Sequence, residues 1–325
     1  MMKQKERIQR LLRGERVSPP LRALWKHFPI VDRIPRRFID RTIAFQERFQ
    51  WDFIKLNFNG LYSVEDWCPG IRWPSNELEV GVVEDFAIKE PKDWLALEPL
   101  NPRHGALGRE RYVTEAVLRR LQGTVPIIAT IFSPLTTAIK MCGDSIFTHM
   151  KEAPKELHRG LEVITRTTVT FVEELKNLGV DGFFFATQLA DSERLSLPLY
   201  KEFGTTYDLP VTETALRGTW FNVFHLHGMQ PMFQLVSQYP FQAVNYHDRR
   251  CGIPLKKARE FTDAVLIGGL DEYGAIQKDQ EEAVKRELRD ALDQLADGKL
   301  ILGPGCVVPV GIPEDRFLWI SNFSE

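Results

Sequence analysis

The chain has 325 residues, with 42 lysine and arginine residues against 44 aspartate and glutamate residues. A formal net charge of −2 offers no basic face of the kind that nucleic acid binding needs, so nucleic acid is not an expected partner. A hydrophobic content of 43% with 26% charged residues excludes a disordered chain and is typical of a globular protein. No apolar run reaches the roughly 18 residues of a membrane span, so we expect no membrane partner.

Cysteine usage and the first residues of the chain bear on the compartment. The four cysteines lie far apart and form no CxxC pair, which favours reduced thiols. The segment 1–16 is strongly charged and carries no apolar stretch long enough for a signal peptide. We therefore expect a cytoplasmic protein whose single domain, 1–325, is large enough to bury a core without disulfides.

Short apolar runs alternate along the chain with longer amphipathic segments, which predicts β/α units around a parallel sheet. Eight runs are the expected strands: Leu21–Lys26, Phe53–Leu56, Val125–Phe132, Gly182–Phe185, Trp220–His225, Ala243–Tyr246, Ala264–Ile267 and Leu300–Leu302. The clearest helical patterns are Arg37–Phe49, Glu110–Leu121, Pro154–Leu178 and Glu281–Leu295.

This order predicts an α/β fold, a (β/α)₈ TIM barrel, with an inserted segment, 57–110, after the second strand. A short hairpin around Val80–Lys89 fits within that insertion. A doubly wound open sheet is the competing architecture. It is disfavoured because no GxGxxG sequence follows an early strand.

A barrel carries its chemistry at the carboxyl ends of the strands, and polar residues gather at these positions. They include Lys26, His27, Asn57, Asn59, Ser133, Thr136, Gln188, His225, His227, His247 and Cys306. Exposure to solvent at any strand end explains polarity in general. It does not explain why four of the seven histidines lie at these ends.

The sharpest local pattern is His225-x-His227, because residues two apart on a strand point to the same face. Two such imidazoles can share a metal ion, and Cys306 after the last strand can supply a thiolate as third ligand. Three protein ligands with one open position are typical of catalytic zinc sites. The alternative is that the two histidines only form hydrogen bonds and that Cys306 is present only because a Gly-Pro-Gly-Cys turn needs a small residue.

A second pattern is His247-Asp248-Arg249-Arg250. Arginine forks match carboxylates, so this segment can bind an anionic substrate, although a surface ion-pair cluster is the equally simple interpretation. Gly269 lies in a glycine pair that either lets a ligand approach the backbone or forms an ordinary turn.

In their order and spacing, several segments resemble the uroporphyrinogen decarboxylase superfamily over nearly the whole chain. The segments are Val125–Ile128 with Ser133–Thr136, Gly179–Gly182, Tyr200–Asp208, His225–Gly228, Asp248-Arg249, Gly268–Asp271 and Ile301–Cys306. The superfamily comprises uroporphyrinogen decarboxylases and zinc-dependent methylcobalamin:coenzyme M methyltransferases, which share a (β/α)₈ barrel.

The decarboxylase branch has an arginine pair after the first strand and an aspartate after the second, which stabilises pyrrole cations. Here Leu24–Phe28 contains no arginine pair, and Asn59 stands at the aspartate position without its charge. Lys140 or a neighbour replaces a family tyrosine, and Cys306 replaces a late histidine. These departures argue against authentic uroporphyrinogen decarboxylation.

The methyltransferase branch holds zinc with a His-x-Cys on the fifth strand and a cysteine after the eighth. His225 and Cys306 match, and His227 replaces the first cysteine, which zinc tolerates. The resemblance thus implies methyl transfer from a corrinoid or other donor to a thiol, with a corrinoid protein as a possible partner. Family decarboxylases are often dimers, so a homodimer is one expected state.

Two alternatives remain open: a tetrapyrrole decarboxylase with altered catalytic groups, and a non-catalytic corrinoid or tetrapyrrole binder. The expected roles are catalytic for Asn59, Asp248, Lys26 and His247; substrate-binding for Arg249, Arg250, Gln188, Ser133 and Gly269; and metal-binding for His225, His227 and Cys306.

Overall fold

The computed structural model describes residues 4–324, in which eight strands form one sheet in the order β1-β10-β9-β8-β7-β6-β5-β2. The strands are β1 (Leu21–Arg22), β2 (Ile54–Leu56), β5 (Ile127–Phe132), β6 (Gly182–Thr187), β7 (Val223–Leu226), β8 (Ala243–Tyr246), β9 (Val265–Leu270) and β10 (Leu300–Pro304). Every pairing in this sheet is parallel. The edges β1 and β2 meet where the Asp52 N–H donates to the Arg22 carbonyl at 2.9 Å, so the sheet curls into the predicted (β/α)₈ barrel.

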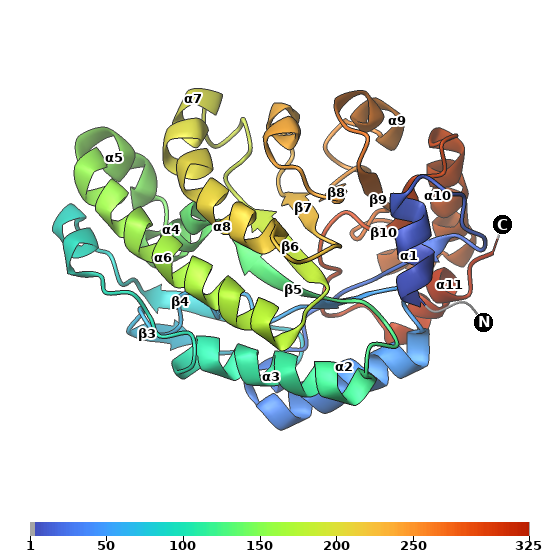
Figure 1. Cartoon of the computed structure of the whole chain (residues 1–325), viewed down its shortest axis with the longest axis horizontal. Coiled ribbons are helices and arrows are strands. Elements are labelled where there is room, and N and C mark those ends of the chain that lie inside the picture. Colours follow the sequence, from blue (N-terminus) through green and yellow to red (C-terminus); the bar gives the residue numbers. More distant parts are fainter. Residues whose placement is uncertain (1–3, 325) are drawn as a thin grey trace.

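Helices surround this sheet on its outer side (Figure 1). They are α2 (Pro35–Phe49), α3 (Gly105–Leu121), α4 (Pro134–Cys142), α5 (Ser145–Glu152), α6 (Pro154–Leu178), α7 (Leu197–Tyr200), α8 (Thr206–Leu216), α9 (Leu255–Ala258), α10 (Glu281–Gln294) and α11 (Leu318–Ser321). The long helix α6 shows why they pack there: Leu157, Leu161, Ile164 and Leu175 lie on one stripe and are all buried. Gly179 ends that helix with a φ of 94°, as its place after the stripe predicts.

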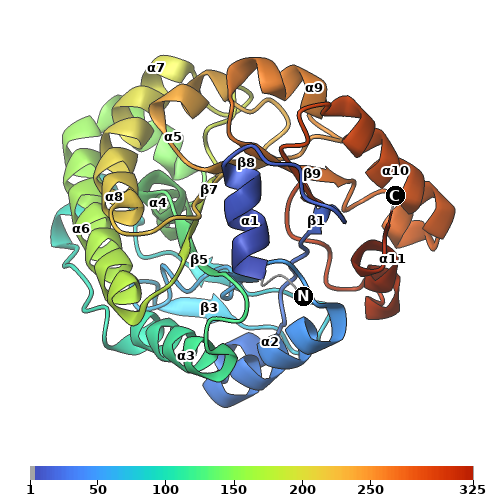
Figure 2. The same ribbon diagram turned by 45° about the vertical axis from the view of Figure 1, so that its right-hand side comes forward.

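The amino-terminal helix α1 (Gln4–Leu12) closes one end of the barrel and was not expected from the sequence. Figure 2 shows it lying across the centre of the ring of helices. Its Ile8 and Leu11 pack with apolar residues at or just before the starts of strands, among them Phe53, Phe221 and Val265. Because apolar side chains fill this end, polar chemistry is confined to the opposite end, where the strands finish.

The insertion after β2 forms the antiparallel strands β3 (Gly70–Arg72) and β4 (Val82–Asp85), followed by a short 3₁₀ helix, Pro91–Ala96. The hairpin was predicted around Val80–Lys89; only β4 lies in that range, and β3 lies entirely before it. Trp94 anchors the insertion, because its indole packs so closely on Gly160 of α6 that an added Cβ would lie 2.3 Å away.

Only the predicted strand Ala243–Tyr246 has the same limits in the structure, and the other seven differ at one or both ends. Leu21–Lys26 was too long: only Leu21–Arg22 joins the sheet, and Lys26 makes an isolated bridge with Val308. β9 and β10 run further than predicted, to Leu270 and Pro304, because the parallel register with their neighbours continues through glycine residues.

Membrane-spanning helices and cysteine pairing are two further points on which the sequence made a prediction. Among residues 4–324, no helix combines the length and apolarity needed to cross a membrane. All four cysteines are free thiols, and Cys68 and Cys142 are buried.

Candidate metal centre

Four side chains with metal-binding atoms converge at the carboxyl end of the barrel. His225, His227, His247 and Cys306 each offer one ligand atom, and these atoms all lie within 4.8 Å of one another. Cys306 Sγ is 3.6 Å from His225 Nε2 and 3.7 Å from His227 Nδ1, while His247 Nε2 is 3.1 Å from His227 Nδ1. A tetrahedral zinc ion with bonds of about 2.0–2.3 Å separates its ligands by roughly 3.3–3.7 Å. The two distances from Cys306 match this spacing, and nitrogen and sulfur donors are those that zinc prefers.

Strand register explains why these side chains meet. His225 on β7 pairs with Asn245 on β8, so His227 and His247 follow two residues later at the same level. Cys306 comes directly after the turn that ends β10. The sequence pattern predicts His225, His227 and Cys306 as ligands and assigns His247 to catalysis, whereas the structure places His247 in the same cluster.

Asn245 orients the first imidazole. Its Nδ2 donates to the carbonyls of Ile267 and Pro304 at 2.9 and 3.0 Å, which fixes Oδ1 as an acceptor. The Nδ1–H of His225 donates to that oxygen at 2.7 Å. The lone pair of His225 Nε2 consequently faces Cys306.

Glu272, which is only 1% exposed, orients the third imidazole and the cysteine loop together. Its Oε1 accepts the Nδ1–H of His247 at 2.7 Å, and its Oε2 accepts the N–H of Gly305 at 3.1 Å. A carboxylate on the far nitrogen of a ligand histidine is the usual way that proteins fix the tautomer at a metal. Glu272 was not predicted, although an acidic residue just after a strand was a usable signal.

The protonation states of Cys306 and His225 suit metal binding. Burial acts to raise the pKa of Cys306, but His225, His227 and His247 hold it well below its usual range, so the sulfur is a thiolate. Burial lowers the pKa of His225 and keeps that ring neutral. Burial also acts to lower the pKa of His247, yet its hydrogen bonds with Cys306 and Glu272 raise it to about 10. Zinc requires a thiolate and neutral imidazoles, so Cys306 and His225 are in the right states, whereas His247 would have to release a proton to bind the metal.

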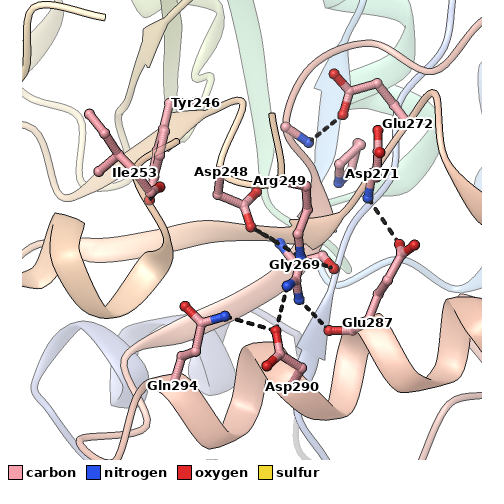
Figure 3. Close-up of polar contacts among 12 residues, drawn as sticks. Tyr246, Asp248, Arg249, Ile253, Gly269, Asp271, Glu272, Glu287, Asp290 and Gln294 are labelled. Atoms are coloured by element: carbon pink, nitrogen blue, oxygen red, sulfur yellow. Dashed lines mark hydrogen bonds and ion pairs between the residues drawn. The ribbon is translucent and has the colours of Figure 1, made fainter. Parts of the chain in front are cut away.

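Figure 3 shows the contacts of Asp248, Arg249 and Gly269, which are not among the four residues of the cluster. Asp248 accepts the N–H of Gly269 at 3.0 Å, and Arg249 Nε donates to the Gly269 carbonyl at 3.0 Å. Arg249 also bonds to Asp290 and to the carbonyl of Glu287 on α10. Since these groups lie between the sheet and α10, the expected catalytic role of Asp248 and substrate contacts of Arg249 and Gly269 are not supported.

Arg250 and Lys26 lie nearer the barrel mouth. Arg250 is exposed, stacks 4.6 Å from the ring centroid of Tyr273 and lies 3.9 Å from Asp271. Lys26 is buried and engaged, because its Nζ lies 3.3 Å from Glu314 and 3.4 Å from the Val310 carbonyl. An ion-paired lysine of this kind is poorly suited to the catalytic role expected for Lys26.

The remaining predicted residues occupy three different places. Asn59 is 5% exposed and lines a cavity of 310 Å³. Ser133 is fully buried at the start of α4, beside the carboxyl group of Asp208. The backbone N–H of Gln188 donates to Thr136 Oγ1 at 2.9 Å, just after β6. Val307, which follows Cys306 in the chain, lines the same cavity as Asn59.

Comparison with solved structures shows the same fold in several proteins. A methyltransferase from Methanosarcina mazei superposes with a TM-score of 0.86 at 17% identity, over 99% of this chain and 98% of that one. A B12-independent methionine synthase from Shewanella sp. W3-18-1, in complex with selenomethionine, superposes with a TM-score of 0.58 at 12% identity, over 93% of this chain and 94% of that one. A putative vitamin-B12 independent methionine synthase from Listeria monocytogenes superposes with a TM-score of 0.56 at 12% identity, over 89% of this chain and 84% of that one.

Sequence comparison identifies the family. No curated protein matches the chain in sequence. The family model described as uroporphyrinogen decarboxylase (URO-D) matches residues 4–323, which is nearly the entire chain. The protein therefore belongs to the uroporphyrinogen decarboxylase family.

Proposed function

We propose that this protein is a zinc-dependent methyltransferase that passes a methyl group from a corrinoid or another donor to a thiol. The observation that carries the proposal is the convergence of His225, His227, His247 and Cys306 with their ligand atoms directed at one another. The methyltransferase from Methanosarcina mazei shares the fold along its whole length, which supports the same reaction class. A decarboxylase would have no evident use for this donor set.

The four cluster residues would hold the zinc ion. Bound zinc lowers the pKa of a coordinated thiol and so makes a thiolate available at neutral pH. Asn245 and Glu272 keep the Nδ1 protons of His225 and His247 in place, so both rings present Nε2 as donor. In the transfer, a sulfur lone pair forms the new S–C bond and the donor keeps the electron pair of the broken bond. The thiol proton passes to water.

An acceptor thiol needs an open position, whereas four protein ligands would fill a tetrahedral site. His227 is the group best placed to yield. Within residues 4–324, its side-chain hydrogen bonds go to His247 and Cys306, and no residue outside the cluster anchors it. His225 and His247 are anchored by Asn245 and Glu272.

Metal content tests the proposal. Protein purified from zinc-supplemented cells should contain about one zinc per chain by elemental analysis. His225→Ala, His247→Ala and Cys306→Ser should each contain clearly less, while His104→Ala, at an exposed histidine outside the cluster, should match the parent. Parent protein without stoichiometric metal would refute the proposal. Metal-loaded protein should then convert a thiol to its methyl thioether with a methylated corrinoid as donor.

A further inference from the structure

The barrel wall has one junction at which neighbouring strands are not paired. The eight-stranded sheet begins at β1 and ends at β2, and among the described residues no strand pairing joins these two edges. Within residues 4–324, a single backbone hydrogen bond links segment 21–26 to segment 52–57, from the Asp52 N–H to the Arg22 carbonyl at 2.9 Å. Beyond this bond, residues 23–26 and 53–56 lie along an unpaired junction, which we call the seam.

Backbone groups face the seam without bonding across it. Ala23 donates its N–H to β10 at 2.9 Å, and Ile54 donates its N–H to the segment that leads into β5 at 2.8 Å. Because successive backbone groups of a strand point to opposite sides, those of Leu24 and Lys55 are turned towards the seam. Leu24 is only 4% exposed. Buried backbone groups are nearly always paired with protein or with ordered water, so partners are expected within the seam.

A cavity of 30 Å³ lies at the seam. Residues 24–26 line it from β1, residues 53–55 line it from β2, and Thr42 and Gln46 line it from α2. Trp51, in the connection between α2 and β2, also lines it. One water molecule needs about 10–15 Å³ of such space, so the cavity has room for one or two water molecules and for no larger ligand.

Three of the lining side chains have a buried polar atom without a partner. Within residues 4–324, Thr42 Oγ1, Gln46 Oε1 and Trp51 Nε1 make no hydrogen bond. The three residues are 7%, 6% and 2% exposed. Gln46 Nε2 donates to the Trp51 carbonyl at 2.9 Å, which leaves Oε1 as an acceptor. Thr42 lies one helical turn before Gln46 on the same face of α2, so the three polar atoms belong to one small region.

The Thr42 hydroxyl does not use the partner that its own helix offers. Helical threonines elsewhere in the chain donate to the carbonyl four residues earlier, as Thr114 and Thr214 do at 2.8 Å. Among the described residues, Thr42 Oγ1 has no such bond with the carbonyl of Phe38. Its hydroxyl is therefore free to bond a molecule in the cavity.

Donors and acceptors both surround the cavity, and this mixture indicates the kind of ligand. Trp51 Nε1 only donates, Gln46 Oε1 only accepts, and the Thr42 hydroxyl does either. An anion would be repelled by Gln46 Oε1. A cation would be repelled by the Trp51 N–H and by Lys55, which also lines the cavity. A water molecule both donates and accepts, so it satisfies all three side chains.

We propose that this cavity is an internal hydration site, in which one or two ordered water molecules bond Thr42, Gln46 and Trp51 and bridge β1 to β2. The water replaces the strand pairing that this junction of the barrel lacks. It joins the two strands that lead into Lys26 and Asn57, and so fixes the spacing of the segments that follow them. The site does not depend on the metal centre.

Cross-relaxation between water and tryptophan indoles tests the proposal. Protein labelled at the indole nitrogen is examined by NMR, and the Trp51 signal is identified by its loss in Trp51→Phe. We expect a cross-peak between the Trp51 Nε1–H and water, with the sign of a long-lived bound molecule. Trp94 is the matched control, because it is fully buried and its Nε1 donates to His149 Nδ1 at 3.0 Å, so it should show none. Absence of the cross-peak at Trp51, or an equal one at Trp94, would overturn the proposal.

Two further variants locate the water. Thr42→Val and Gln46→Leu each remove one of its partners and keep the Trp51 indole. The loss of one hydrogen bond changes an equilibrium by about 2- to 10-fold, so the Trp51 cross-peak should weaken at least about twofold in each variant. Thr114→Val is the matched control, because that hydroxyl bonds its own helix, and it should leave the cross-peak unchanged. An undiminished cross-peak in both variants, with circular dichroism confirming that they fold, would overturn the proposal.

A crystal structure of the parent protein grown in bromide tests the identity of the ligand. Water within hydrogen-bond distance of Trp51 Nε1 and Gln46 Oε1 would support the proposal. An anomalous bromide peak at that place would assign an anion and overturn it, and so would an empty cavity. None of these measurements involves zinc, so failure here would leave the metal proposal intact.

Discussion

Replacing Glu272 by glutamine should weaken zinc binding without removing a ligand. Both carboxylate oxygens are used: one accepts the Nδ1–H of His247 at 2.7 Å and the other accepts the N–H of Gly305 at 3.1 Å. Glutamine has one acceptor oxygen, and its amide nitrogen would face an N–H donor at the second position. The change therefore disturbs either the His247 ring or the loop that carries Cys306.

The size of the effect follows from the bond that is lost. A hydrogen bond to a charged group contributes about 1.5–3 kcal/mol, and here it acts on the orientation of a ligand. That range corresponds to a loss of about 10- to 100-fold in zinc affinity, which is also the usual effect of removing a group that orients a metal ligand. Because Glu272 is buried, water cannot replace the missing acceptor.

Competition with a chromophoric chelator measures the affinity. Asp248→Asn is the matched control: Asp248 is a buried carboxylate next to His247 in the chain, but it accepts the N–H of Gly269 on the α10 side of the sheet. We expect Asp248→Asn to lose stability and keep zinc affinity. The reasoning would be refuted if Glu272→Gln bound zinc as tightly as the parent, or if Asp248→Asn showed the larger loss.

Three further predictions concern stability and the geometry of the site. Burial lowers the pKa of Lys55, so the folded protein binds fewer protons than the unfolded chain between pH 7 and 10.5. Lys55→Met should therefore be more stable than the parent by roughly 2–4 kcal/mol at pH 7 in urea unfolding, and this difference should vanish as the pH approaches 10.5. Arg249→Ala leaves Asp248 without its cation and should lower the unfolding free energy by about 2–4 kcal/mol in the same assay, with unchanged zinc content. Gly228 has a φ of 118°, and a Cβ added there would lie 1.8 Å from a carboxylate oxygen of Asp191. Gly228→Ala should therefore displace the adjacent loop that carries His227 and weaken zinc binding in chelator competition. Gly218→Ala, at a positive φ in open space, should not.

The barrel could be predicted because its strands are continuous apolar runs between amphipathic helices. The run Ala243–Tyr246 has the predicted limits, since both faces of that strand are covered. The ends of β9 and β10 could not be predicted from propensity, because Gly268-Gly269 and Gly303-Pro304 look like turns. They extend as strands because the parallel ladder supplies partners that local sequence does not reveal.

At the candidate metal centre, the alternation of side chains along β8 already distinguishes His247 from Asp248. Asn245 and His247 lie on the same face of β8 as Ala243, which is in the barrel core, while Asp248 falls on the opposite face. This alternation predicts that His247 points inward beside His227 and that Asp248 points away from the barrel interior. Glu272 could not be found in this way, because its contacts depend on the loop conformation after β9.

Two features at the carboxyl end of the barrel lower stability in the absence of ligands, and both are therefore best explained by function. A cluster of three imidazoles and a thiolate gains its main stabilisation only when a metal is bound. Lys55 and Lys140 are buried without a carboxylate partner among residues 4–324, and burial lowers the pKa of each to about 7, which is unfavourable for a charged lysine. β7, β8 and the end of β10 supply the first feature, and β2 and α4 supply the second. Both features lie where a barrel places its chemistry, at the carboxyl ends of its strands.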